Sequence, residues 1–363
     1  MVFFLRRAAV KKCTGKVVVF GATSVVGQSL SLLLTLCPHV KEVFCCGSLN
    51  KAIDDTMKTP AHGVAVDLSH IDTSTLVRGI DNPSHWEIAL SGAQLVLICS
   101  GNVFDPPRVH RDLSLSESAP EVIVAMEAVA RAAPKAVIGV VSSPVNALVP
   151  LAKEVLVRHG VFDPRKLFGI TSLDVVRART LVAQELQMNP YDVNIPVVGG
   201  RGGLTACPLI AQTGLRIPHE RIMRLSERLQ SYGAPIPDNN SNETILKDGQ
   251  KTEESKNNNF DLDVAPPVGL SLAYAAMEWY VSVLKAMRGD RGIIECTYVE
   301  STMRKETPFF SSRVELGEEG VSQLLPIEPL TSYEAELVEA AVPLIVEDVE
   351  AGVRFASMKT KEV

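Results

Sequence analysis

The chain has 363 residues, which is too many for one compact core and few for three domains, so two domains are expected. Apolar residues make up 46% of the chain and charged residues 21%, a balance typical of a globular protein with a sizeable core. The net charge of −6 argues against a protein that coats nucleic acid, and no run of 18 apolar residues is present to span a membrane.

Two features of the sequence bear on the compartment of the protein. Seven cysteines are scattered without a C-x-x-C pair, which indicates reduced core thiols and no metal site. The first 15 residues are apolar and basic, and the first acidic residue is Glu42, as in a mitochondrial presequence. The alternative is a plain N-terminal arm that precedes the first strand. We therefore expect residues 1–15 to be a targeting arm and the protein to be mitochondrial, or otherwise cytoplasmic.

Strand-like and helix-like patterns alternate along the first half of the chain. The β-branched run at 16–20 predicts a strand, and the helical pattern after it ends before Pro38. A second strand is expected at 42–46, and further strands at 93–99 and 136–141. This alternation predicts an α/β domain over residues 16–170, built on a parallel, doubly wound sheet with its ligand crevice at the carboxyl ends of the strands.

The second half of the chain is less regular. Helical patterns at 173–186, 217–229, 270–287 and 333–355 are separated by short strands, which predicts an α+β domain over residues 171–363. Residues 235–263 contain six asparagines and few apolar residues. Such a segment buries too little surface to order itself, so it is expected to be a long polar surface loop.

The first predicted strand is followed by the motif GATSVVGQ, at the point where a pyrophosphate would bind the N-terminus of a helix. Gly21 permits the tight turn and Gly27 permits close packing, but Ser24 and Val25 stand where the dinucleotide fingerprint has its middle glycine. With Gln28, these are the expected cofactor-binding residues of the turn.

The end of the second strand departs further from the fingerprint. An acidic residue normally binds the adenosine ribose there, and this chain has Gly47 and Ser48 instead. Without that negative charge a 2′-phosphate is not repelled, and Ser48 could contact it. The site is therefore expected either to prefer NADP(H) or to bind a dinucleotide weakly or not at all.

Several longer motifs carry a family resemblance. They are GVAVDLSHIDT at 63–73, SSPVNALVP at 142–150, GVFDPRKLFGITSLDVVRARTLVAQEL at 160–186 and ECTYVES at 295–301. In these stretches the chain resembles malate dehydrogenases of the mitochondrial and glycosomal type, over nearly its whole length. The resemblance implies a Rossmann domain, an α+β catalytic domain, NAD or NADP as cofactor, interconversion of malate and oxaloacetate, and a homodimer or a dimer of dimers.

The resemblance also assigns site residues. Asn146 matches a substrate-binding asparagine, Asp174 the aspartate that orients the catalytic histidine, and Arg177 the arginine that binds the substrate carboxylate. Ser142 opens the motif that would contact the cofactor. In the loop that closes over the substrate, the resemblance implies one arginine that polarises the carbonyl group and a second that binds the distal carboxylate of malate. Arg111 matches the second arginine, whereas Phe104 takes the place of the first.

The expected catalytic histidine is absent. The family turn Gly-Gly-His reads Gly199-Gly200-Arg201 in this chain, and a guanidinium cannot accept a proton as an imidazole does. We expect Arg201 to pair with Asp174, and His110 is a candidate substitute acid–base group. The protein is therefore expected to be weakly active or non-catalytic, binding a small dicarboxylate or forming a heterodimer with a paralogue. The alternative is a functional NAD(P)-dependent dehydrogenase for malate or another 2-hydroxy acid.

Overall fold

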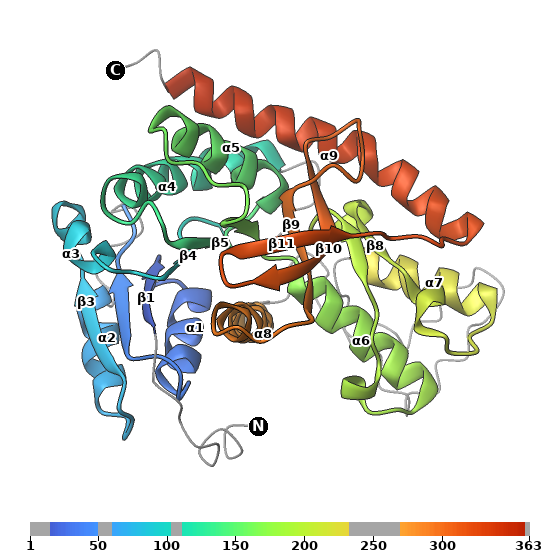
Figure 1. The fold of residues 1–363 in the computed structure, drawn as a ribbon, viewed down its shortest axis with the longest axis horizontal. Helices are drawn as coiled ribbons and strands as arrows, with labels where there is room; N and C mark the ends of the chain where they lie inside the picture. The colour runs from blue at the N-terminus through green and yellow to red at the C-terminus, as the bar shows by residue number, and fades with distance from the viewer. Residues whose placement is uncertain (1–14, 50–59, 103–110, 232–268, 360–363) are drawn as a thin grey trace, which may run out of the picture.

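The computed structural model describes residues 15–49, 60–102, 111–231 and 269–359, which form two lobes along one mixed sheet (Figure 1). Residues 1–14 of the expected targeting arm and the expected polar loop at 235–263 lie outside the described residues.

The strands of the first lobe are parallel and follow the order β3-β2-β1-β4-β5-β6. Their bounds are β1 (Lys16–Phe20), β2 (Glu42–Cys46), β3 (Leu76–Ile80), β4 (Leu95–Ile98), β5 (Val137–Val140) and β6 (Leu167–Gly169). The order reverses direction between β1 and β4, where doubly wound sheets hold their ligands. The prediction of a parallel, doubly wound sheet is confirmed.

Antiparallel pairing continues the sheet into the second lobe, in the order β6-β9-β10-β7-β8, with β11 paired to β10. These strands are β7 (Val197–Gly199), β8 (Ala206–Pro208), β9 (Ile293–Glu300), β10 (Phe309–Gly317) and β11 (Gly320–Leu325). The predicted α+β character of the second half is therefore confirmed as well.

Helices cover both faces of the parallel strands. One face packs against α1 (Val25–Thr35), α2 (Ala61–Ser69) and α8 (Gly269–Met287), and the other against α3 (Trp86–Leu90), α4 (Arg111–Ala132), α5 (Val145–Arg158) and α9 (Ser332–Lys359). Successive residues of a strand point to opposite faces, so Val17 and Val19 pack with α1 while Val18 and Phe20 pack with α4. None of the described helices is long and apolar enough to cross a membrane.

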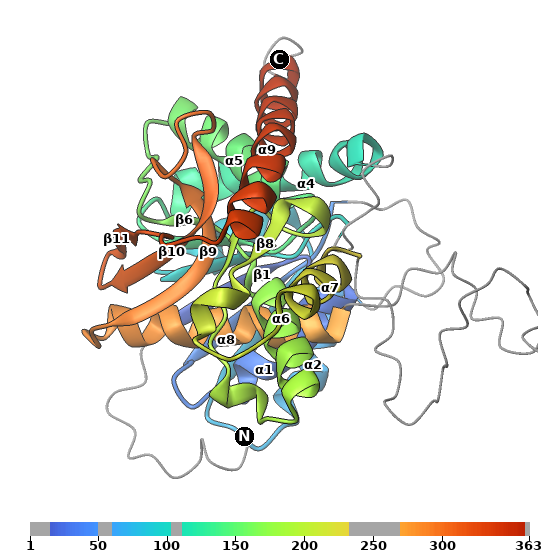
Figure 2. The same cartoon turned by 90° about the vertical axis from the view of Figure 1, so that its right-hand side faces the viewer.

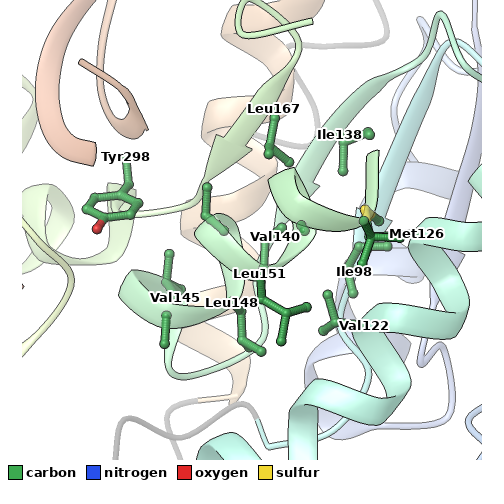
Figure 3. Packing of buried hydrophobic residues seen from close by; sticks show 14 of the residues in the cluster. Ile98, Val122, Met126, Ile138, Val140, Val145, Leu148, Leu151, Leu167 and Tyr298 are labelled. Carbon is green, nitrogen blue, oxygen red and sulfur yellow. The ribbon is translucent and has the colours of Figure 1, made fainter. Parts of the chain in front are cut away.

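A large apolar cluster lies between the sheet, α4, α5 and α9. Figure 3 shows part of it, with Val122 and Met126 of α4, Leu148 and Leu151 of α5, and Val140 of β5 in one group. The long helix α9 lies along α5 on the outer side (Figure 1). This packing holds the first turn of α5 and the carboxyl ends of β4 and β5 in place, and these segments carry several of the expected site residues.

The second lobe has a smaller apolar cluster of its own. Helices α6 (Ser172–Leu186) and α7 (His219–Gln230) lie beside β8 (Figure 2), and Val182, Val197 and Leu225 are buried between them. Helix α6 starts three residues after β6, so its first turn projects from the carboxyl edge of the sheet.

The cysteines of the described ranges are free and buried: Cys37, Cys45, Cys46, Cys99, Cys207 and Cys296. Burial raises the pKa of the Cys45 thiol to about 11 and that of Cys99 to about 12. These thiols are unreactive core residues, as the sequence predicted.

Candidate active site

The turn between β1 and α1 brings three backbone segments into close contact. Gly21 has φ +70°, and a Cβ there would lie 2.5 Å from the backbone nitrogen of Ser100, just beyond β4. A Cβ at Gly27 would lie 2.1 Å from the carbonyl oxygen of Gly21. Both glycines are therefore required by the approach of β1, β4 and α1 to one another.

Ser24 keeps this turn intact where the dinucleotide fingerprint has a glycine. Its hydroxyl oxygen accepts a hydrogen bond from the N–H of Gly27 (3.0 Å) and lies 3.2 Å from the carbonyl oxygen of Cys99, to which it donates. Ser24 is thus the N-cap of α1. Val25 is 54% exposed at the first turn of the helix, and Gln28 donates to the carbonyl oxygen of Thr23 (2.8 Å). All five expected residues lie at this turn.

The turn after β2 contains a carboxylate that the sequence analysis did not find. The hydroxyl of Ser48 donates to Oε1 of Glu121 (2.5 Å), and the N–H of Leu49 donates to Oε2 (2.8 Å). Glu121 belongs to α4 and is only 2% exposed. The prediction of a turn without negative charge is therefore wrong, because α4 supplies a carboxylate from a distant part of the chain.

A second carboxylate lies on the other side of the same turn. Gly47 donates its N–H to the carbonyl oxygen of Ile80 (3.1 Å), which is followed by Asp81. Asp81 accepts hydrogen bonds from the N–H groups of Ala61 (2.6 Å) and His62 (3.3 Å) and so caps α2. Asp81 fixes the position of α2 beside Gly47, whereas Glu121 fixes the conformation of Ser48.

Ser142 connects the carboxyl ends of two neighbouring strands, β4 and β5. Its buried hydroxyl lies 3.0 Å from the carbonyl oxygen of Ile98 and 2.6 Å from that of Ser100. The side chain therefore ties the segment after β5 to the end of β4, within the region where a cofactor is expected.

Asp174 and Arg177 lie on the first turns of α6, where the resemblance predicts the aspartate that orients the catalytic histidine and the arginine that binds the substrate carboxylate. Asp174 is 1% exposed and accepts a hydrogen bond from the N–H of Gly202 (3.0 Å). Nη1 of Arg177 lies 3.6 Å from Oδ1 of Asp174. The fold thus brings α6 against the turn that follows β7.

Arg201, in that turn, is buried (5% exposed). Its Nη1 donates to the carbonyl oxygens of Ile170 (3.1 Å) and Val141 (3.3 Å), so the guanidinium lies against the segments that follow β5 and β6. The expected ion pair between Arg201 and Asp174 stays a prediction. The guanidinium of Arg201 offers no atom that can accept a proton.

Asn146 and Arg111 meet at one acidic residue of α9. Oδ1 of Asn146 accepts the N–H of Arg201 (2.8 Å), and Nδ2 donates to Thr205 (3.3 Å) and to Oδ2 of Asp348 (3.0 Å). The guanidinium of Arg111 forms an ion pair with the same Asp348 carboxylate, which is 3% exposed. Asp348 lies 202 residues from Asn146 and 237 from Arg111, and no local motif marks it.

Residues 103–110 of the closing loop, which include Phe104 and His110, lie outside the described residues. Within the described ranges, no group of three or more His, Cys, Asp and Glu side chains is placed to hold a metal ion.

A parallel sheet with this strand order and a capped helix at its reversal point is typical of dinucleotide-binding domains. Residues 15–169 match the NAD-binding domain of lactate/malate dehydrogenases, and residues 171–240 and 268–356 match the alpha/beta C-terminal domain. The chain therefore belongs to the lactate/malate dehydrogenase family.

Individual relatives are malate dehydrogenases of plant organelles. The chain is 36% identical over 342 residues to the glyoxysomal enzyme of Oryza sativa subsp. japonica, covering 94% of this chain and 86% of that one. It is 36% identical over 344 residues to malate dehydrogenase 2, mitochondrial, of Arabidopsis thaliana, covering 94% and 91%. The solved malate dehydrogenase of Cryptosporidium parvum shares the fold, with a TM-score of 0.68 at 21% identity over 93% of this chain and 98% of that one.

Proposed function

We propose that the chain binds NAD(H) and a small 2-hydroxy or 2-oxo acid, and that it converts this ligand slowly or not at all. The observation that carries the proposal is the buried guanidinium of Arg201, which replaces the family histidine and donates to Ile170 and Val141. Interconversion of a hydroxyl and a carbonyl needs a group that takes up and releases a proton near neutral pH. Loss of such a group typically lowers the rate about 10²- to 10⁴-fold.

Arg177 is the group best suited to bind the carboxylate of the ligand. Its planar guanidinium can donate two parallel hydrogen bonds to a carboxylate, and the side chain is 19% exposed. The buried carboxylate of Asp174, 3.6 Å away, holds the arginine in place. In this chain Asp174 therefore positions two cationic elements, Arg177 and the turn that carries Arg201.

The turn between β1 and α1, here called the phosphate turn, has the features needed to bind the pyrophosphate of NAD. Gly21 and Gly27 leave no room for a Cβ, and the N-terminus of α1 favours an anionic group. When bound, NAD supplies the acceptor or donor of hydride. Glu121 favours NAD over NADP, because its carboxylate beside Ser48 would repel a 2′-phosphate. The sequence analysis expected a preference for NADP(H), or weak binding, because no acidic residue ends the second strand. The carboxylate of Glu121 beside Ser48 argues against that expectation.

We also propose that the chain assembles as a homodimer or with an active paralogue, and that it works in mitochondria. Leu270 supports assembly, since it is 70% exposed and leaves apolar surface on the first turn of α8. The basic, acid-free residues 1–15 support the mitochondrial location.

The test of the proposal is the rate at which the purified protein oxidises NADH or NADPH with oxaloacetate or pyruvate. We expect a rate at or below the detection limit. Arg201→His alone should recover little, whereas Arg201→His with Phe104→Arg should recover more than the product of the single changes, because catalytic groups act as one unit. Turnover of tens per second by the unmodified protein would contradict the proposal and direct attention to His110.

A further inference from the structure

The second carboxylate site expected from the family resemblance contains a carboxylate of the protein itself. Arg111 forms an ion pair with Asp348, and Asn146 donates to the other carboxylate oxygen of Asp348 (3.0 Å). Both oxygens of this side chain are therefore bound by the two residues that were predicted to bind a ligand.

Packing fixes Asp348 in this position. Ile345 and Val349, on the same helix, are buried in the large apolar cluster. One turn further on, Gly352 lies so close to α5 that a Cβ there would be 2.0 Å from the carbonyl oxygen of Ala147. Helix α9 thus rests directly against the first turn of α5, which carries Asn146, and this contact holds the backbone of Asp348 beside Asn146.

The charges around Arg111 leave little attraction for a further anion. Besides Asp348, its guanidinium has Oδ1 of Asp112 at 3.7 Å and Oε2 of Glu347 at 3.9 Å. Three carboxylates thus surround one positive charge. By contrast, Arg177 forms one ion pair among the described residues, with Asp174 at a distance of 3.6 Å. A ligand carboxylate is therefore attracted to Arg177 and repelled near Arg111.

We propose that Asp348 acts as a built-in second carboxylate, so that the site accepts 2-hydroxy or 2-oxo acids with one carboxylate and discriminates against dicarboxylates. This inference rests on the proposed function, because it concerns the ligand that Arg177 binds. Asp348 is a specificity-determining residue in this scheme. It replaces the expectation from sequence that Arg177, Arg111 and Asn146 together hold a dicarboxylate.

The experiment compares two probes by calorimetry in the presence of saturating NADH: oxamate, with one carboxylate, and tartronate, with two. The unmodified protein should bind oxamate at least about ten-fold more tightly than tartronate, the difference expected from one charge-assisted interaction. Asp348→Asn keeps the shape of the side chain and removes its charge. It should tighten tartronate binding at least about ten-fold and change oxamate binding less than about two-fold.

Two variants serve as controls. Glu347→Gln removes the same charge from the neighbouring residue, which is 59% exposed and 3.9 Å from Arg111. Because solvent screens an exposed charge, this variant should tighten tartronate binding much less than Asp348→Asn does. Arg111→Gln combined with Asp348→Asn should abolish the gain in tartronate binding, because the freed guanidinium is then absent.

Equal or tighter binding of tartronate than of oxamate by the unmodified protein would overturn the inference while leaving the proposed function intact. Equal gains for both probes in Asp348→Asn would also overturn it. If Asp348→Asn does not fold, the comparison of the two probes on the unmodified protein still decides. If the protein binds neither NADH nor oxamate, the proposed function is wrong, and this inference is overturned with it.

Discussion

The hydroxyl of Ser48 donates a 2.5 Å hydrogen bond to the buried carboxylate of Glu121, which lies 73 residues further along the chain. Because the other carboxylate oxygen accepts the N–H of Leu49, the side chain is held at the carboxyl end of β2 from two directions. The turn thus carries a negative charge although no acidic residue ends the strand.

We expect Glu121→Gln to weaken the preference for NAD(H) over NADP(H). The amide can still accept a hydrogen bond from Ser48, but the repulsion of a 2′-phosphate is lost, an effect of about ten-fold in the ratio of affinities. Calorimetric titration with each cofactor measures this ratio. Glu117→Gln, on an exposed position of the same helix, is the matched control and should not change it. An unchanged ratio in Glu121→Gln would mean that the carboxylate does not face the ribose.

We expect Gly21→Ala to destabilise the protein much more than Gly160→Ala. The two glycines have nearly the same backbone conformation, with φ of +70° and +69°, but Gly21 faces Ser100 whereas nothing lies within 4 Å of a Cβ at Gly160. The positive φ alone costs about 1 kcal/mol, and the clash at Gly21 should raise the loss to about 3 kcal/mol or more. Chemical denaturation of both variants measures the difference. Equal losses would show that conformation, not close approach, requires the glycine at 21.

The stability of the protein should depend on the ionisation of Glu295 on β9. Burial raises the pKa of this carboxyl from 4.5 to about 7. Its contribution to the free energy of unfolding is therefore fully present below pH 4.5, and is lost as the pH rises to about 7, because the unfolded chain ionises first. Glu295→Gln should remove this decline, about 1 to 3 kcal/mol, and be the more stable form at pH 8.

Thermal denaturation between pH 4 and pH 8 checks this dependence. Glu306→Gln, at an exposed position, is the control and should follow the unmodified protein. A profile for Glu295→Gln that declines as steeply as that of the unmodified protein would show that another group is responsible.

Residues 1–15 should direct a fused fluorescent protein to mitochondria. The segment contains four basic residues, a fifth follows at Lys16, and no acidic residue is present. This is the charge pattern of an amphipathic import signal. The measurement is co-localisation with a mitochondrial marker. A variant with Arg6 and Arg7 changed to Glu is the control and should remain diffuse, and a diffuse signal from the natural segment would contradict import.

The elements of the core were predictable because their signals are local. The apolar runs at 16–20 and 42–46 coincide with β1 and β2, and the helical pattern at 270–287 lies within α8 (Gly269–Met287). The edge strand β3 (Leu76–Ile80) was not predicted, because its residues are only partly buried and it lacks a continuous apolar run. Strands β9 to β11 are stabilised by pairing with one another rather than by a pattern visible in one segment.

The family, the parallel sheet, the phosphate-binding turn between β1 and α1 and the replacement of a histidine by Arg201 were all predictable from the amino-acid sequence. These depend on residue types at fixed spacing, which can be read along the chain. The carboxylates that lie at the site were not predictable in this way, because Glu121 contacts Ser48 from 73 residues away and Asp348 contacts Arg111 from 237 residues away. The physical reason is that α4 and α9 are positioned by packing of their apolar faces, and that packing brings polar residues on the same helices to groups far away in the sequence.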